Sequence, residues 1–241
     1  MFDMNYSNKS GIDEIRKRFD SDVERFSNLE TGQQTILDAP VMLDLTTGAA
    51  FFTNPDAKNL LDIGCGAGNY SLKMLGKIQG LNCLLMDLSM PMLVRAMERV
   101  SANTSGRVEI MQEDILKAAL PENQFDIVLA ASVLHHLRGD ADWKNVFQKI
   151  YRSLKPGGSF WISDLITQET DALNRLFTDQ YARHLDSLGG EAYRKKVFEY
   201  IEREDTPRSL NFQLGLMKEA GFRHTEILHK NGPFAAFGGI K

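Results

Sequence analysis

Apolar runs and amphipathic stretches alternate through the middle of this 241-residue chain. Short apolar runs typical of buried strands occupy residues 60–63, 82–86, 108–111, 125–130 and 159–163. Between most of these runs, apolar residues recur at three- and four-residue spacing, which predicts helices at 70–78, 90–100 and 143–154. Such alternation predicts a parallel sheet with helices on both faces.

Two further zones are helical in pattern and flank this alternating region. In residues 11–52, apolar side chains recur at helical spacing at Ile12, Ile15, Phe19, Val23 and Phe26. This pattern predicts two helices that lie over the core. Residues 169–220 are also helical in pattern, with breaks at Gly189-Gly190 and at Pro207, and therefore predict three helices.

The chain closes on two β-like runs, residues 222–228 and 234–240. They flank the segment 229–232, which ends in Asn231-Gly232. Asn-Gly between two such runs is a strong signal for a hairpin, because both residues tolerate the positive φ of a tight turn. We therefore predict two antiparallel strands at the end of the chain.

Composition narrows the class of protein. The chain is 43% hydrophobic and 25% charged, which is typical of a soluble globular protein. A net charge of −4 disfavours binding to nucleic acid or to an anionic membrane. The two cysteines, Cys65 and Cys83, make no disulfide framework, and no apolar stretch approaches the roughly 18 residues needed to span a bilayer. We therefore expect a cytoplasmic protein that is not embedded in a membrane.

A glycine turn follows the first predicted strand. Gly64, Gly66 and Gly68 allow the backbone to turn sharply and to approach a ligand without an intervening Cβ. This geometry is typical of sites for nucleoside-bearing cofactors. Dinucleotide folds use G-x-G-x-x-G, and here Asn69 stands where their third glycine would be. The G-x-G-x-G spacing favours S-adenosylmethionine instead.

Acidic residues follow the next two predicted strands. Asp87 ends the second strand, where a carboxylate can accept hydrogen bonds from both hydroxyls of a ribose. Glu113 and Asp114 follow the third strand. Each acid also fits a simpler role, because Asp87 could stabilise a helix N-terminus and Asp114 could cap a short helix. Their joint position beside the glycine turn favours cofactor binding.

Four stretches in this order resemble the class I S-adenosylmethionine-dependent methyltransferases. They are residues 61–68, 84–89, 112–115 and 125–137, the last followed by Leu154-Lys155-Pro156-Gly157-Gly158. The resemblance covers residues 59–166 and the closing hairpin. It implies S-adenosylmethionine as the cofactor. The cofactor contacts it implies are Asp62, Gly64, Cys65, Gly66, Gly68, Asp87, Leu88, Glu113, Asp114, Ile115, Ala130, Ala131 and His135.

This resemblance completes the predicted fold. We expect one α/β domain over residues 1–241, with a Rossmann-like, doubly wound, seven-stranded and mostly parallel sheet. Its parts are an N-terminal helical cap (1–56), a cofactor-binding core (57–166), a helical insertion (167–220) and the closing hairpin (221–241). Ligands of open α/β sheets bind at the carboxyl ends of the strands, so the insertion is predicted to form a lid there.

The pair His135-His136 could suggest a metal site. Adjacent residues on a helix or loop point in different directions, and no cysteine or carboxylate cluster completes a coordination shell. We therefore predict no metal. In the resembled family this stretch closes the cleft, which implies packing and contact with the methionine end of the cofactor.

Methyl transfer from a sulfonium is an in-line displacement, and a base is needed only if the acceptor arrives protonated. Candidate bases in the insertion are Tyr181, His184 and Tyr193, although packing or surface roles also fit them. Residues 169–208 hold seven Lys and Arg against nine Asp and Glu, which disfavours a nucleic-acid substrate. A small-molecule acceptor is expected.

A second resemblance keeps an alternative open. Residues 19–26 and 216–222 are similar to the carboxy-S-adenosylmethionine synthases, which carboxylate the methyl of the cofactor by using prephenate. That family has serine where this chain has Gly66, and only Arg194 could stand for its carboxylate-binding arginine. A third alternative is a non-catalytic module that binds S-adenosylmethionine.

Overall fold

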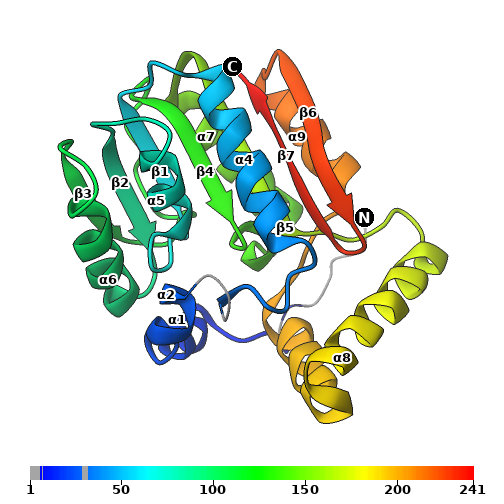
Figure 1. Ribbon diagram of the computed structural model, residues 1–241. Helices are drawn as coiled ribbons and strands as arrows, with labels where there is room; N and C mark the ends of the chain where they lie inside the picture. The colour runs from blue at the N-terminus through cyan, green and yellow to red at the C-terminus, as the bar shows by residue number, and fades with distance from the viewer. Residues whose placement is uncertain (1–5, 7, 29–31) are drawn as a thin grey trace.

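The computed structural model describes residues 6, 8–28 and 32–241. Seven strands form one sheet in the order β3-β2-β1-β4-β5-β7-β6 (Figure 1). The strands are β1 (Asn59–Ile63), β2 (Asn82–Asp87), β3 (Val108–Gln112), β4 (Phe125–Ala131), β5 (Leu154–Leu165), β6 (His224–Asn231) and β7 (Phe234–Ile240). The first five strands are parallel and β7 is antiparallel to both of its neighbours. The predicted Rossmann-like sheet is confirmed.

Helices cover both faces of the sheet, as predicted (Figure 1). The described helices are α1 (Ile12–Asp20), α2 (Val23–Ser27), α4 (Ala39–Thr53), α5 (Asn69–Leu75), α6 (Met90–Ser101), α7 (Asp140–Ser153), α8 (Asp171–Glu204) and α9 (Leu210–Ala220). On one face α4, α5 and α6 pack through Ala50, Met74 and Leu93. On the other, α7 and α9 pack through Phe147 and Met217. Each of these five helices buries apolar side chains against the sheet.

The hairpin is confirmed, but its turn is shorter than expected. β6 continues to Asn231, which pairs with Phe234, so the loop is only Gly232-Pro233. The sequence placed the end of this strand at residue 228, and that boundary is wrong. His229 and Lys230 pair with Ala236 and Ala235 because the turn needs positive φ only at Gly232, where φ is 57°.

The fifth strand also begins earlier than predicted. Helix α7 ends at Ser153, and β5 starts at once with Leu154 rather than at residue 159. Gly157 and Gly158 lie within it, because the N–H of Gly157 donates to the carbonyl of Lys241 and Gly158 accepts from the N–H of Lys241. The end of the chain therefore supplies hydrogen bonds to this glycine-rich stretch, in which Gly157 has a φ of 78° and the pairing with β4 is irregular.

The helical zones follow the predicted pattern with local differences. The N-terminal zone has α1, α2 and α4 in place of the two helices expected, and residues 29–31 of that zone lie outside the described residues. α8 is broken at Gly189-Gly190, where Gly190 has a φ of 72°. With α9 it gives the three helical segments predicted between residues 169 and 220.

Candidate functional site

The three glycines of the turn after β1 all have positive φ, with values of 64°, 50° and 84° for Gly64, Gly66 and Gly68. Their surroundings differ. A Cβ on Gly64 would lie 2.6 Å from the Cβ of Val133, and one on Gly68 would lie 3.3 Å from the Cβ of Ala96. A Cβ on Gly66 would meet nothing within 4 Å. Packing therefore requires the outer glycines, whereas Gly66 presents its backbone to open space.

Asp87 lies against this turn. Its Oδ2 accepts a hydrogen bond of 2.9 Å from the N–H of Gly66, and its Oδ1 accepts one of 2.9 Å from the N–H of Ser89. Burial raises the pKa of this carboxyl, and the backbone hydrogen bonds partly offset that effect. The sequence thus correctly brought Asp87 and the glycine turn together, across the parallel pairing of β1 with β2.

The acids after β3 are engaged locally. Asp114 Oδ1 accepts from the N–H of Leu116 at 2.9 Å, as a capping side chain does. Glu113 is exposed and its N–H donates to the carbonyl of Asp87, which joins this loop to the end of β2. Ile115 is buried in the core. Leu88 accepts at its carbonyl from Gln112. Direct cofactor contact by these residues stays a prediction.

Asp62 and Cys65 have structural partners under the turn. Asp62 is 1% exposed and accepts a 2.6 Å hydrogen bond from the hydroxyl of Ser71. Desolvation raises the pKa of Asp62 to about 7. Burial also raises the pKa of the Cys65 thiol well above its ordinary value, so this cysteine is an inert packed residue. Contact of Asp62 and Cys65 with the cofactor stays a prediction, and neither side chain faces open space.

The end of β4 holds a feature that sequence reasoning missed. Ala130 is buried and Ala131 half-buried, and the next residue, Ser132, is exposed with a φ of 53°. The N–H of Ser132 donates to the carbonyl of Ser163 at 2.8 Å. Positive φ is uncommon outside glycine and marks a turn held by its surroundings. A serine gives no signal of it in the sequence.

Asp164 of β5 fixes the short 3₁₀ helix Leu134–His136 that follows β4. Its buried carboxylate accepts from the N–H groups of Leu134 and His135 and pairs with Nδ1 of His135. At 1% exposure Asp164 has no water to replace these partners. The hydrogen bond to Nδ1 sets the ring orientation and directs Nε2 of His135 away from β5.

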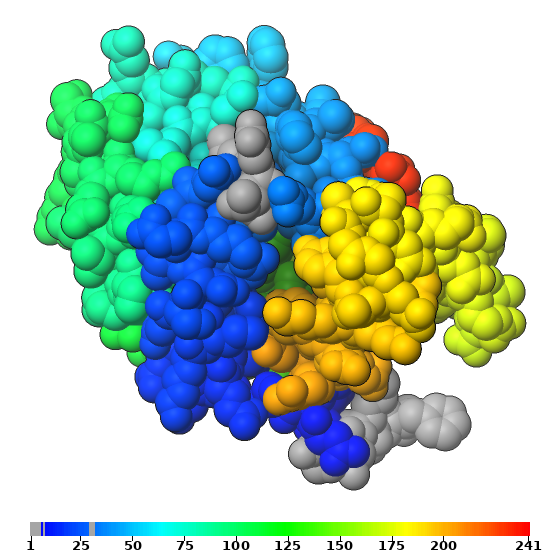
Figure 2. Space-filling model, turned by 60° about the horizontal axis from the view of Figure 1, so that its bottom comes forward, coloured from blue at the N-terminus to red at the C-terminus, as the bar shows by residue number. Residues whose placement is uncertain are grey.

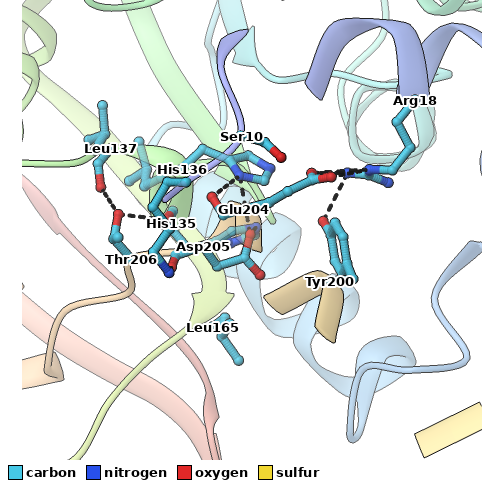
Figure 3. A network of polar contacts seen from close by, with 12 residues as sticks. Ser10, Arg18, His135, His136, Leu137, Leu165, Tyr200, Glu204, Asp205 and Thr206 are labelled. Atoms are coloured by element: carbon cyan, nitrogen blue, oxygen red, sulfur yellow. Dashed lines mark hydrogen bonds and ion pairs between the residues drawn. The ribbon is translucent and has the colours of Figure 1, made fainter. Parts of the chain in front are cut away.

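The other end of this histidine pair meets Asp205, which follows α8. Oδ1 of Asp205 lies 3.2 Å from Nδ1 of His136 and 3.7 Å from Nε2 of His135 (Figure 3). The argument that no carboxylate lies near these histidines is therefore wrong. It failed because Asp164 and Asp205 are 29 and 70 residues downstream of His135 and only the tertiary fold brings them there.

These carboxylates set the charge of His135. Burial alone lowers the pKa of His135, but Asp164 and Asp205 outweigh it and raise that pKa to about 9. Burial would raise the pKa of Asp205, and His135 and His136 instead hold it below its ordinary value. Two buried atoms, Nε2 of His136 and Oδ1 of Asp205, make no hydrogen bond to any described residue. Buried polar atoms without partners are rare and call for an explanation.

The segment around Asp205 joins the end of α8 to the N-terminal helices. Glu204 accepts hydrogen bonds of 2.8 to 3.0 Å from Arg18 of α1, and Arg18 also donates to the hydroxyl of Tyr200 (Figure 3). The N–H of Thr206 donates to the carbonyl of His135 at 2.7 Å. The end of α8 is thus fastened over the end of β4. The acidic pair before Pro207 is the sequence signal that could have drawn attention to it.

A hollow lies between these elements. Figure 2 shows it between α1 and α2, in blue, and the end of α8, in orange, with green atoms from the middle of the chain at its floor. It opens at the carboxyl ends of the parallel strands, where open α/β sheets bind their ligands.

Comparison with known proteins identifies a methyltransferase domain in the chain. Residues 60–158 match the family model described as "Methyltransferase domain". The chain is 28% identical over 193 residues to demethylmenaquinone methyltransferase of Listeria monocytogenes, covering 76% of this chain and 78% of that protein. It is also 28% identical over 201 residues to carboxy-S-adenosyl-L-methionine synthase of Helicobacter pylori, covering 78% of this chain and 80% of that protein.

A solved structure agrees with this likeness at the level of the fold. Human N-acetylserotonin methyltransferase in complex with SAM superposes with a TM-score of 0.60 at 19% identity, over 94% of this chain and 56% of that one. The present chain thus spans about half the length of the human protein.

Residues 60–158 thus form a methyltransferase domain, and the chain has the fold of the class I S-adenosylmethionine-dependent methyltransferases.

The cofactor of this methyltransferase is S-adenosylmethionine, as predicted. The glycine turn and Asp87 both fall within the matched region. Among the described residues of the methyltransferase, no helix has the length and apolar character to cross a bilayer.

The candidate bases of the methyltransferase lie on α8. Tyr181 is 3% exposed and packs edge-on against Phe234, and burial raises the pKa of its hydroxyl. His184 is half-buried, and its Nε2 lies 3.3 Å from the carbonyl of Gln34. Tyr193 is half-buried and packs against the same cluster as Tyr181. These environments are those of packing and surface residues, and a role as a base stays a prediction for each.

Proposed function

We propose that this methyltransferase transfers the methyl group of S-adenosylmethionine in line to a small-molecule acceptor bound in the hollow between α1 and the end of α8. The observation that carries this proposal is the roof beside the hollow, which α1 and the end of α8 form together. Arg18 joins α1 to Glu204 at 2.8 Å, and the N–H of Ser10 donates to the carbonyl of Arg203 at 2.9 Å. A roof fastened at two points favours a compact acceptor over a polymer.

The roof is also rigid where it meets the hollow. The guanidinium of Arg18 stacks on Phe19 and Tyr200, 4.1 and 4.2 Å from the ring centroids. Phe19 in turn packs against Phe26 and against the edge of His136. Such a layer of rings and stacked cation excludes water from the site below it, which is the main requirement of methyl transfer from a sulfonium.

The cofactor half of the proposal places the ribose at Asp87. The two backbone hydrogen bonds that its carboxylate accepts leave lone pairs for two ribose hydroxyls. The open backbone at Gly66 gives the methionine part of the cofactor room to pass the turn. The fold then aligns the methyl donor with the acceptor, and a base is needed only for a protonated acceptor.

Replacing Asp87 with alanine is expected to weaken binding of S-adenosylhomocysteine by about 1–3 kcal/mol, or roughly 5- to 150-fold, since two buried hydrogen bonds to the ribose are lost. Isothermal titration calorimetry measures the change. Glu226→Ala, on exposed edge strand β6, is the matched control and should bind like the unaltered protein. An unchanged affinity in Asp87→Ala would remove Asp87 from the site.

The acceptor itself can be found with S-adenosylmethionine labelled in its methyl group. The protein is incubated with the labelled cofactor and a fractionated metabolite extract, and mass spectrometry follows both S-adenosylhomocysteine and the labelled product. Formation of both from a small-molecule fraction supports the proposal. If the cofactor binds but no fraction yields S-adenosylhomocysteine, methyl transfer to a small molecule fails as the function.

A second candidate function is modification of the cofactor itself, because the chain is as similar to the Helicobacter pylori synthase as to the Listeria methyltransferase. The existing ion pairs of Arg194, the arginine that could hold a carboxylate, favour methyl transfer over carboxylation of the cofactor. Arg194 is already paired, with Asp186 at 2.6 Å and with Glu191 at 3.7 Å. Incubation with S-adenosylmethionine and prephenate distinguishes the two, because only a synthase would yield the carboxylated cofactor.

A further inference from the structure

We propose that His135, His136 and Asp205 form a binding site for a divalent transition-metal ion at the end of β4. One nitrogen of each imidazole and one carboxylate oxygen converge, and the three ligand atoms all lie within 4.8 Å of one another. Oδ1 of Asp205 is 3.2 Å from Nδ1 of His136 and 3.7 Å from Nε2 of His135. Ligands bound to one metal at about 2.0–2.2 Å are separated by distances of this order.

The partners behind these ligands favour a metal. His135 gives its Nδ1 to the buried carboxylate of Asp164, so that its Nε2 faces Asp205 and binds a metal when the ion displaces its proton (Figure 3). Carboxylate, histidine and metal in this order is the usual arrangement around a bound ion, because the carboxylate fixes the tautomer and the ring orientation. The N–H of Leu134 donates to the same carboxylate and holds it in place.

Asp205 supplies an independent observation. Its side chain is only 2% exposed, and Oδ1 lies between the two imidazoles, in ion-pair contact with both but without a hydrogen bond from any described residue. A buried carboxylate oxygen without a hydrogen bond is costly, and a cation in front of it removes that cost. The backbone on both sides of Asp205 is fixed, because Arg138 donates to the carbonyl of Glu204 and the N–H of Thr206 to the carbonyl of His135.

The donor set defines the class of metal. Two imidazoles and one carboxylate suit zinc, iron(II) and similar first-row ions, and suit magnesium or calcium poorly. Three protein ligands leave at least one coordination position for water or another oxygen ligand. If the proposed function holds, an oxygen of the acceptor would occupy that position, since His136 also packs against Phe19 of the roof. The metal site itself does not depend on that role.

Cobalt(II) is the probe for the test, because its visible absorption reports both binding and ligand geometry. The full chain is prepared without a polyhistidine tag, stripped with a chelator and titrated with cobalt(II), then with zinc(II) in competition. We expect one saturable equivalent per chain. Absence of saturable binding of either ion up to millimolar concentration would overturn the proposal.

Variants assign the bound ion to this cluster. Asp205→Asn keeps the shape of the side chain and should weaken cobalt(II) binding by more than about 100-fold, and Asp164→Asn should weaken it by about 10- to 100-fold. His224→Gln, at an exposed position on β6, is the matched control and should bind normally. Normal binding by Asp205→Asn would place the ion elsewhere and overturn the assignment.

Folding and cofactor binding are followed in the same samples. Far-ultraviolet circular dichroism tests that each variant is folded. If Asp205→Asn does not fold, His136→Gln takes its place in the binding test. Binding of S-adenosylhomocysteine is measured alongside. Asp87→Ala should lose affinity for S-adenosylhomocysteine and keep the metal, so failure of the metal site is distinguishable from failure of the proposed function.

Discussion

Replacing Gly64 with alanine is expected to lower the free energy of unfolding by about 2–5 kcal/mol. At its φ of 64° an alanine is strained by about 1–2 kcal/mol. The new Cβ would also lie 2.6 Å from the Cβ of Val133, which adds about 1–3 kcal/mol of overpacking. Urea unfolding followed by circular dichroism measures the loss.

Gly66→Ala is the matched control for this prediction. It shares the positive φ, at 50°, but its Cβ would meet nothing within 4 Å, so only the strain of about 1–2 kcal/mol should appear. Its methyl group would occupy the open space beside the turn, and we expect weaker binding of S-adenosylhomocysteine. Equal loss of stability in the two variants would contradict the role of Val133. Adding Val133→Ala to Gly64→Ala should restore part of the loss.

Replacing Asp62 with asparagine is expected to remove a dependence of stability on pH. The folded protein holds the pKa of Asp62 at about 7, against an ordinary value of 3.8, because burial disfavours the charged carboxylate. The folded state therefore binds a proton that the unfolded state releases. The resulting stabilisation is fully present below about pH 4 and is lost as the pH rises to about 7.

The size of this effect follows from the change in proton affinity, at about 1.4 kcal/mol for each tenfold step, and is on the order of 4 kcal/mol. Asparagine can still accept from the hydroxyl of Ser71 and carries no charge at any pH. Urea unfolding between pH 4 and pH 8 should thus show that the free energy of unfolding of Asp62→Asn increases relative to that of the unaltered protein as the pH rises. A constant difference between the two proteins would contradict the assignment.

Asp126→Asn should change the dependence of stability on pH in the opposite direction. Lys155 and the N–H groups of Lys58 and Asn59 pair with the carboxylate of Asp126 and, although burial opposes them, hold its pKa below the ordinary value. The stability that Asp126 contributes is present above about pH 4 and lost as the pH falls further. The difference between this variant and the unaltered protein should therefore shrink in acid.

Much of the fold was predictable because local patterns carry it. Apolar runs and helical periodicity gave the order of strands and helices, and Asn231-Gly232 gave the hairpin. The errors fall where a distant segment decides the local structure. The early start of β5 depends on Lys241, which supplies hydrogen bonds to Gly157 and Gly158.

The candidate site also has features that the local sequence predicts and features that only the packed molecule decides. Gly66 and Asp87 lie on consecutive strand ends of a parallel sheet, so their spacing along the chain was enough to bring them together. The roles of Tyr181, His184 and Tyr193 could not be read from their residue types, because full burial against Phe234 or partial burial elsewhere is a property of the packed molecule.

The sequence by itself determined that this protein has a Rossmann-like sheet with a glycine turn after its first strand, because strand, turn and helix signals act over a few residues. Only the tertiary structure decided what surrounds His135 and His136. Asp164 and Asp205 come from separate elements, β5 and the end of α8, and meet the pair through packing and buried hydrogen bonds. Contacts between residues so far apart leave no periodic trace along the chain.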